Sequence, residues 1–291
     1  KKNISESKSS KKSSKARRRA RARRRTYLNA LLSGYKWDRK NLTYGFHNGS
    51  GSQYRKWNAT QKANAVAGLK SWQKVCGLAF TATSYANASI KFHLVGNPNY
   101  QYLGHAFFPV GKNKGKIYIS HNNATDKTFK VGGYDYITII HEIGHALGFS
   151  HTHDGTKFPG VGNPWTGGKN NQNIVLNTIM GYNDLSGPLT SKTKTNYGFV
   201  AGPMAYDVNA AQHLYGKPGA SNKNNTYKMN KKFFETIVDT GGKDTIVSTS
   251  DKNTKIDLRQ ATVDGNRIRG GGAPSYQKGV KGGFTISKGT V

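Results

Sequence analysis

Cysteine is almost absent from this chain, since Cys76 is the single cysteine among 291 residues. One cysteine excludes an intramolecular disulfide framework. Its apolar surroundings in SWQKVCGLAF favour a buried core thiol over a reactive one. The low cysteine content fits both a cytosolic protein and a bacterial secreted one, so it does not identify the compartment.

Long apolar runs are also missing. No segment approaches the ~20 apolar residues that a membrane span needs. The basic N-terminus is not followed by the apolar region of a secretory signal peptide. The sequence begins with Lys1 rather than Met, so we expect a processed or truncated product.

Acidic residues are scarce, with 14 Asp and Glu against 45 Lys and Arg, a formal net charge of +31. The electrostatic field of such a positive charge favours anionic partners. Residues 1–25 contain 13 of the basic residues and one acid, Glu6. This segment has a single aliphatic residue larger than alanine, so we predict that it is disordered. It is either an arm for nucleic acid or anionic membrane surfaces, or a propeptide remnant, linker or solvated tail. The second interpretation is favoured, because the segment lacks aromatic residues for base stacking.

From Thr26 onward the pattern is that of an α+β globular protein. Apolar residues at helical spacing predict amphipathic helices, and alternating or apolar runs bounded by Gly, Asn and Asp predict strands. The predicted helices lie within 59–80, 132–148 and 202–216, and the predicted strands within 41–47, 88–95 and 115–120. Short β-type runs after residue 218 predict a smaller β-rich domain at 219–291, following a larger domain at 26–218.

Residues 141–151, HEIGHALGFSH, combine three histidines and a glutamate. On a helix, His141 and His145 are one turn apart, so their rings project from the same face and can bind one metal ion. Glu142 is offset by about 100°, where it flanks the metal as a general base instead of acting as a ligand.

The third ligand follows the helix. Gly148 permits a sharp turn with positive φ, and this turn returns His151 toward the metal. Three neutral imidazoles leave one zinc position open for water, as in catalytic sites. The alternative, three unrelated histidines, is disfavoured by the fixed glycine and the apolar periodicity. His153 is interpreted as a loop residue.

The pattern HExxHxxGxxH resembles the zinc signature of the metzincins, which have a Met-turn beneath the metal. The segment NTIMGYND supplies one: the resemblance implies that Met180 forms an apolar floor under the zinc ligands. The M-x-Y form is similar to that of astacins and serralysins. It implies that Tyr182 is a fifth zinc ligand in the resting enzyme, which swings away when substrate binds and donates a hydrogen bond to the oxyanion.

The cysteine-poor serralysins match better than the astacins, which have glutamate after the third histidine and use disulfides; here Thr152 follows His151. The segments LLSGYKW, NLTYGF, GHAFFP, GPMAYDVNAAQHLYG and DTGGKDTI resemble serralysins from about residue 27 to the end. The resemblance implies a metzincin-type zinc protease domain with a mixed sheet and a long active-site helix. It also implies a secreted, extracellular, monomeric metalloendopeptidase that acts on protein and peptide substrates.

The chain departs from the serralysin pattern in several places. Thr152-His153-Asp154-Gly155 replaces the usual Pro-Gly after the third histidine, and Gly181 stands where Ser is common. The chain stops at Val291, before the GGxGxDxUx calcium repeats with which serralysins continue. We therefore expect either a clipped piece or a member without a full calcium β-roll.

A calcium site is predicted at the start of the second domain. In DTGGKDT the resemblance implies that Asp239, Gly241, Gly242 and Asp244 supply carboxylate and backbone oxygens, which are suitable calcium ligands. The alternative is a Gly-Gly hairpin with polar flanks. The partner loop, ASNKNNTY, lacks the family's Arg-x-Gly-x-Thr pattern.

The resulting hypothesis is a zinc-dependent endopeptidase that uses a metal-activated water. Glu142 serves as general base, and an edge strand such as GKIYIS pairs with the substrate backbone. A catalytically reduced cationic binding protein on a protease fold is the alternative, and the intact Glu142 argues against it. A zymogen blocked by the N-terminal segment is a third hypothesis; a cysteine switch is excluded within residues 1–25, which contain no cysteine.

Overall fold

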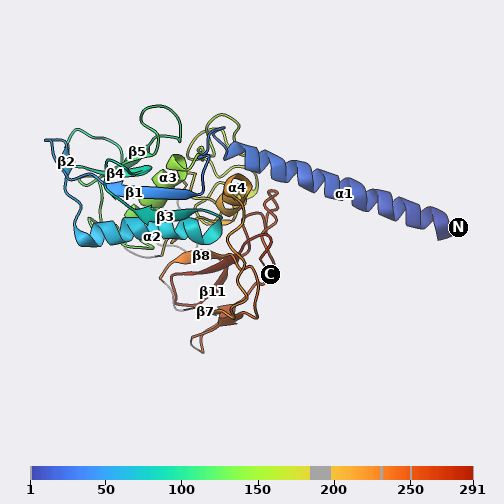
Figure 1. The fold of residues 1–291 in the computed structure, drawn as a ribbon. Helices are drawn as coiled ribbons and strands as arrows, with labels where there is room; N and C mark the ends of the chain where they lie inside the picture. Colours follow the sequence, from blue (N-terminus) through green and yellow to red (C-terminus); the bar gives the residue numbers. More distant parts are fainter. Residues whose placement is uncertain (1, 184–197, 230–231, 250, 291) are drawn as a thin grey trace.

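The computed structural model describes residues 2–183, 198–229, 232–249 and 251–290 (Figure 1). The described helices are α1 (Lys2–Ala30), α2 (Ala59–Val75), α3 (Tyr134–Ala146) and α4 (Ala205–Tyr215), with a 3₁₀ turn at Lys169–Asn171. The first six strands are β1 (Asn41–Phe46), β2 (Tyr54–Arg55), β3 (Ala79–Ala82), β4 (Ile90–Val95), β5 (Gly104–Ala106) and β6 (Lys116–Ser120). The later strands are β7 (Thr226–Lys228), β8 (Phe234–Ile237), β9 (Thr245–Val247), β10 (Thr254–Lys255), β11 (Ser275–Gln277) and β12 (Gly283–Ile286). The α+β prediction is confirmed.

The N-terminal strands form a mixed sheet in the order β3-β1-β4-β6-β5, with β2 pairing to β4. The strands β3, β1, β4 and β6 are parallel, and β5 runs antiparallel to β6. The predicted edge strand GKIYIS is β6, which lies between β4 and β5, so that prediction is wrong. The edge strand next to β6 is the short β5. The sequence does not predict this strand, because three residues are too few to show alternation.

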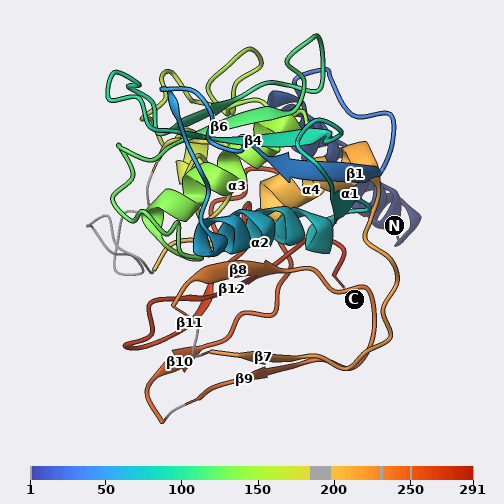
Figure 2. The ribbon, with the colours of Figure 1, turned by 60° about the vertical axis from the view of Figure 1, so that its left-hand side comes forward.

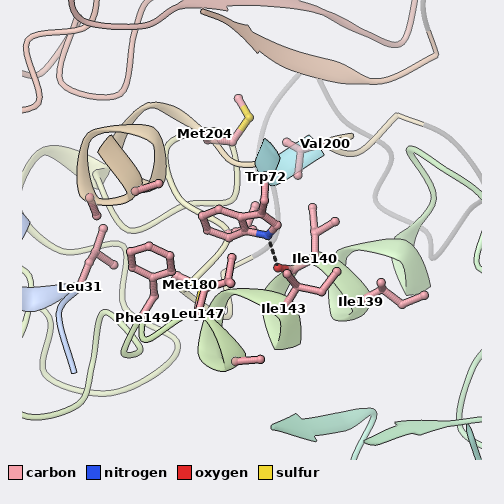
Figure 3. Close-up of a cluster of buried hydrophobic side chains, with 14 of the residues drawn as sticks. Leu31, Trp72, Ile139, Ile140, Ile143, Leu147, Phe149, Met180, Val200 and Met204 are labelled. Atoms are coloured by element: carbon pink, nitrogen blue, oxygen red, sulfur yellow. Dashed lines mark hydrogen bonds between the residues drawn. The ribbon is translucent and has the colours of Figure 1, made fainter. Parts of the chain in front are cut away.

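Helix α2 packs its apolar face against α3. A capping box starts it: Asn58 Oδ1 accepts from the Gln61 amide at 2.9 Å, and Gln61 Oε1 accepts from the Asn58 amide at 2.9 Å. Trp72 is completely buried and its indole N–H donates to the Ile140 carbonyl at 3.0 Å (Figure 3). This bond fixes the position of α3 without leaving a buried indole N–H unpaired.

Helix α3 ends where the sequence predicted. Gly148 has φ +102°, and a Cβ there would lie 2.1 Å from the Tyr35 carbonyl oxygen, so only glycine fits. The carbonyls of its last turn are paired, because Trp37 Nε1 donates to Ala146 at 2.9 Å and the Tyr215 hydroxyl donates to Leu147 at 2.5 Å. These two contacts hold the end of the histidine-bearing helix in place.

Helices α2, α3 and α4 lie between the mixed sheet and the C-terminal strands (Figure 2). The C-terminal strands form a four-stranded sheet, β10-β11-β12-β8, and the pair β7-β9. Phe234, Ala261 and Val263 from this region belong to the same buried cluster as the helices. The predicted β-rich region therefore exists, and part of it shares the main core.

The N-terminal segment differs from the prediction. We expected disorder over residues 1–25, whereas residues from Lys2 onward form helix α1, which projects from the body (Figure 1). Its Ala, Arg and Lys content, with no Gly or Pro, explains this, since these residues have high helix propensity. The last turn of α1 packs through Tyr27, which stacks on Tyr206 with ring centroids 5.0 Å apart. Within the described residues, no helix combines the length and the apolar character that a bilayer crossing requires.

Candidate metal centre and catalytic site

Three imidazole nitrogens converge at the end of α3. The Nε2 atoms of His141 and His145 are 3.0 Å apart, and they lie 3.1 and 2.9 Å from Nε2 of His151. Nitrogens that bind one tetrahedral zinc at ~2.0–2.1 Å would lie roughly 3.3 Å from one another. The triangle therefore has about the size that a shared zinc ion requires.

The other nitrogen of each ring faces an acceptor. Nδ1 of His141 lies 2.6 Å from the Ile179 carbonyl, and Nδ1 of His145 lies 2.7 Å from the Phe149 carbonyl. Nδ1 of His151 lies 2.6 Å from Oδ2 of Asp154. These acceptors place the ring proton on Nδ1 and leave the three Nε2 lone pairs free for a metal.

Burial keeps the three rings neutral. It lowers the pKa of His141 to about 4 and that of His151 to about 2, and it lowers the pKa of His145 well below its usual value. Mutual repulsion among the rings lowers the pKa values of His145 and His151 further. Neutral imidazole is the form that coordinates zinc, so this cluster is ready for a metal near neutral pH.

Glu142 lies beside this cluster and is buried, with 5% of its surface exposed. Its Oε2 atom has no hydrogen-bond partner among the described residues. Burial raises the pKa of this carboxyl to about 8. Gly104 of β5 makes the approach possible, because a Cβ there would lie 2.9 Å from Glu142 Cγ. An orphaned buried carboxylate oxygen is expensive, and a bound water or substrate in this cleft would satisfy it.

The Met-turn lies under the histidines. Met180 is completely buried, and the space beside Gly144 is so small that a Cβ there would lie 2.6 Å from Met180 Sδ. Figure 3 shows Met180 below Trp72 and beside Leu147. The turn is fixed by Asp207 of α4, whose carboxylate accepts from the Thr178 hydroxyl at 2.6 Å and the Ile179 amide at 2.9 Å. Because Ile179 also accepts from His141, α4 orients a candidate metal ligand.

Tyr182 also lies at the cluster of three histidines. Its hydroxyl lies 2.9 Å from Nε2 of His151, and its side chain remains partly exposed. Burial and the nearby Glu142 and Asp154 raise the pKa of this phenol to about 12, so the hydroxyl is protonated and able to donate. The five predicted zinc-site residues, His141, Glu142, His145, His151 and Tyr182, are thus brought together.

One residue near the site, Asp154, was given no role by the sequence interpretation. Asp154 contacts His151, and its position three residues later was the available signal. His153, predicted as a loop residue, lies in a loop, but its ring stacks on His151 with centroids 4.7 Å apart. Together with His151 and Asp154 it forms a second group of ligand atoms within 4.8 Å of one another.

The four residues predicted for calcium lie in one turn. Asp239 accepts hydrogen bonds from the Asn225 side-chain amide at 2.8 Å, the Tyr227 hydroxyl at 2.7 Å, and the backbone amides of Thr240 and Gly241. Asp244 accepts from the Asn225 backbone amide at 2.8 Å. Gly241 and Gly242 both have positive φ. Hydrogen-bond donors thus surround the Asp239 carboxylate, where a cation would have to bind.

A family model described as matrixin, a family of peptidases, matches residues 36–158 of this chain. Metallopeptidase AprA of Pseudomonas marginalis is 27% identical over 268 residues, covering 82% of this chain and 52% of the relative. Serralysin A of Dickeya chrysanthemi is 27% identical over 280 residues, covering 86% of this chain and 55% of the relative. The serralysin of Proteus mirabilis is 28% identical over 202 residues, covering 62% and 38%. The chain spans about half the length, or less, of these relatives.

Proposed function

We propose that this chain, which belongs to the serralysin family of metzincins, is a zinc-dependent endopeptidase. The proposal rests on one observation: three unprotonated Nε2 atoms, 2.9–3.1 Å apart, converge beside a buried glutamate oxygen without a partner. His141, His145 and His151 would hold the ion, and Tyr182 would be a fifth ligand at rest. Zinc, when bound, supplies Lewis acidity toward the scissile carbonyl and the attacking water.

Glu142 would move the protons of the reaction. Its buried carboxylate would accept a proton from the attacking water and return it to the leaving amine. The Tyr182 hydroxyl would donate a hydrogen bond to the scissile carbonyl oxygen as negative charge develops on it. Met180 would support the ligands from below through packing alone.

The edge strand β5 would bind the substrate backbone. Within the described part of the chain β5 pairs with β6 only, so its second edge is available for an extended peptide. Gly104 at the start of β5 lies against Glu142. A peptide added to this edge would therefore pass the general base, which is the arrangement that protein substrates require.

The test is Glu142→Ala, with Glu142→Gln as the variant of matched shape. Both should retain one zinc per chain, measured by elemental analysis, because neither removes a ligand. Both should lose nearly all hydrolysis of casein. Undiminished cleavage by a zinc-loaded variant would exclude this role for Glu142.

Calcium is the second cofactor that the sequence suggested. The donors around Asp239 do not fit a cation unless Asn225 and Tyr227 turn away, so we infer that this turn does not bind calcium. Calcium added to the calcium-free, zinc-loaded protein should then leave casein hydrolysis and Tm unchanged, whereas the zinc chelator 1,10-phenanthroline should abolish hydrolysis. A rise in Tm with calcium that Asp239→Asn abolishes would restore the calcium prediction.

A second candidate function is binding to anionic surfaces or nucleic acid. A cavity of about 420 Å³ between α1, α4 and the C-terminal residues is lined by four cationic side chains and no acidic one: Arg21, Arg24, Arg25 and Lys288. The salt dependence of retention on immobilised DNA, compared between the full chain and a variant lacking residues 1–25, tests it.

The organisation of the protein stays part of the proposal. We take residues 26–218 as the catalytic domain and residues 219–291 as a smaller β-rich domain, with residues 1–25 as a basic arm. A secreted, extracellular and monomeric protease is what the serralysin resemblance implies, and the buried Cys76 offers no surface thiol for intermolecular disulfides.

A further inference from the structure

The ring of His153 lies beside the metal centre and has no part in the proposed reaction. Its side chain is 8% exposed. Its Nδ1 atom is buried and has no hydrogen-bond partner among the described residues. Its Nε2 atom lies 3.9 Å from Oδ1 of Asp154, which is too far for a hydrogen bond. A buried imidazole without such partners is costly, so His153 points to a ligand that the chain does not itself supply.

The backbone that carries His153 is fixed. The preceding residue, Thr152, is completely buried, and its amide donates to the Met180 carbonyl at 3.2 Å. The Thr152 hydroxyl donates to Asn173 Oδ1 at 2.6 Å, and the Phe158 amide donates to the Thr152 carbonyl at 2.9 Å. The Met-turn that lies under the three histidines therefore also sets the position of His153.

The His153 ring packs against two residues of the candidate site. It stacks on His151 with ring centroids 4.7 Å apart and an angle of 12° between the planes. It also contacts Tyr182, with ring centroids 4.6 Å apart. These contacts restrict the rotation of the imidazole, so that its Nε2 atom is held near the Asp154 carboxylate.

The two oxygens of Asp154 face different histidines. Oδ2 lies 2.6 Å from Nδ1 of His151, whereas Oδ1 faces Nε2 of His153. Zinc binds imidazole nitrogen and carboxylate oxygen at ~2.0–2.2 Å, which places two ligands of a tetrahedral ion roughly 3.4 Å apart. The Asp154 side chain is 58% exposed and free to adjust. A shift of ~0.5 Å would bring the observed 3.9 Å to the separation that one shared ion requires.

We propose that Nε2 of His153 and Oδ1 of Asp154 form a second zinc site, next to the site of the three histidines. Ligand atoms of His151, His153 and Asp154 lie within 4.8 Å of one another. One imidazole and one carboxylate suit zinc better than calcium or magnesium, which prefer oxygen ligands. Two protein ligands hold an ion less tightly than three, so the second site fills after the first.

Occupation of the second site should slow hydrolysis, a consequence that rests on the proposed protease function. A second cation draws the Asp154 carboxylate toward itself and weakens its hydrogen bond to His151, a candidate ligand of the first ion. It also places positive charge close to that ion. Loss of such a partner lowers activity by about 10–100-fold. We therefore expect zinc beyond one ion per chain to lower kcat/KM about tenfold.

Zinc stoichiometry tests the site without any hydrolysis. Equilibrium dialysis against increasing free zinc, followed by elemental analysis, should show a second ion in the parent after the first. His153→Gln and Asp154→Asn should each bind one ion fewer than the parent, while the first ion shows that the metal centre is still folded. His213→Gln, which removes an exposed histidine outside both groups of ligand atoms, is the matched control. One ion in the parent, or as many ions in either variant as in the parent, would overturn the site.

Kinetics test the effect on hydrolysis, with each protein compared with itself. The value of kcat/KM for a chromogenic peptide is measured with one zinc per chain, and again at the zinc concentration that saturates the second site. The parent and His213→Gln should lose about tenfold, whereas His153→Gln should lose little. An equal loss in the parent and in His153→Gln would mean that zinc inhibits elsewhere, and would overturn the coupling between the two sites.

The outcomes separate the second site from the proposed function. Casein hydrolysis by a chain that binds a single zinc ion would leave the protease function standing and remove the second site. A second ion that His153→Gln removes, in a chain that hydrolyses no casein, would support the site and contradict the protease function.

Discussion

Asp154 accepts a 2.6 Å hydrogen bond from Nδ1 of His151, the candidate ligand that lies outside the helix. His141 and His145 donate to backbone carbonyls, so His151 is the one of the three histidines whose Nδ1 donates to a side chain. A carboxylate in this position fixes the tautomer and increases the basicity of the coordinating nitrogen. We therefore expect the zinc affinity to depend on Asp154, whose side chain can be substituted without changing the backbone.

Asp154→Ala should weaken zinc binding about 10–100-fold, the usual effect of losing such a partner. The cause is a freely rotating His151 ring in place of an oriented one. Competition with a zinc-selective chelator measures the affinity directly. Asp38→Ala, which removes an exposed carboxylate elsewhere, should leave it unchanged. An unaltered zinc affinity in Asp154→Ala would refute the positioning role.

Tyr182→Phe should lower kcat about a hundredfold while zinc content stays at one per chain, because the hydroxyl acts on the developing oxyanion. The three imidazoles still hold the ion, so the loss should lie in kcat more than in KM. Steady-state kinetics on a chromogenic peptide and elemental analysis check both statements. A loss of zinc that parallels the loss of activity would instead make Tyr182 a required ligand.

Gly144→Ala should destabilise the fold by about 1–3 kcal/mol, the typical cost of overpacking a core. The added Cβ would lie 2.6 Å from Met180 Sδ and 3.1 Å from a ring carbon of Trp72, and both side chains are buried. Denaturant unfolding of the zinc-loaded protein measures the change. Gly219→Ala is the matched control, since nothing lies within 4 Å of its added Cβ. Similar stabilities for the two variants would contradict tight packing under the histidines.

The parts of the fold that the sequence predicted have strong local signals. Helices α2, α3 and α4 and strands β1, β4 and β6 have clear periodicity and were predicted close to their observed positions. The edge position of β5 was missed because pairing order depends on long-range contacts. Helix α1 was missed because composition suggested disorder, whereas the absence of Gly and Pro favours a helix.

The candidate site likewise contains residues that local sequence patterns predict and residues that they do not. His141, Glu142, His145 and Gly148 were predictable because one helix and its final turn determine their geometry. Tyr182 and Met180 came from a family resemblance, since nothing local indicates that residue 182 returns to His151. Trp165 and Tyr102 were not predicted to line the cavity beside the metal centre, because side-chain hydrogen bonds from Asn183 and Asn123 hold the segments that carry them. No periodic pattern encodes such contacts.

Acid should destabilise the protein through His93, a buried histidine in the mixed sheet. Its Nδ1 lies 3.1 Å from the Ile117 carbonyl, its Nε2 lies 2.7 Å from the Tyr85 hydroxyl, and its ring stacks on Tyr118 with centroids 4.2 Å apart. Burial lowers the pKa of His93 to about 4, and the neighbouring His47 and Lys116 contribute to the shift. The histidine is therefore held neutral in the folded protein.

The direction of the pH effect follows from this shift. The folded-state pKa lies below the unfolded value of about 6.5, so the unfolded chain takes up the proton first as the pH falls. The stability that neutral His93 contributes is complete above the unfolded pKa and is lost progressively between about pH 6.5 and 4, by on the order of 2 kcal/mol at pH 4.5.

His93→Phe keeps an aromatic ring against Tyr118 and removes this titration. Its free energy of unfolding should therefore fall less than that of the parent between pH 7.5 and 4.5, whatever its stability at pH 7.5. Urea unfolding at both pH values measures this difference between the variant and the parent. Zinc release at low pH affects both proteins equally, so it cancels from the comparison. His213→Gln, an exposed change on α4, is the matched control for the replacement of a histidine. The same pH dependence in His93→Phe and the parent would exclude His93 as the acid-sensitive group.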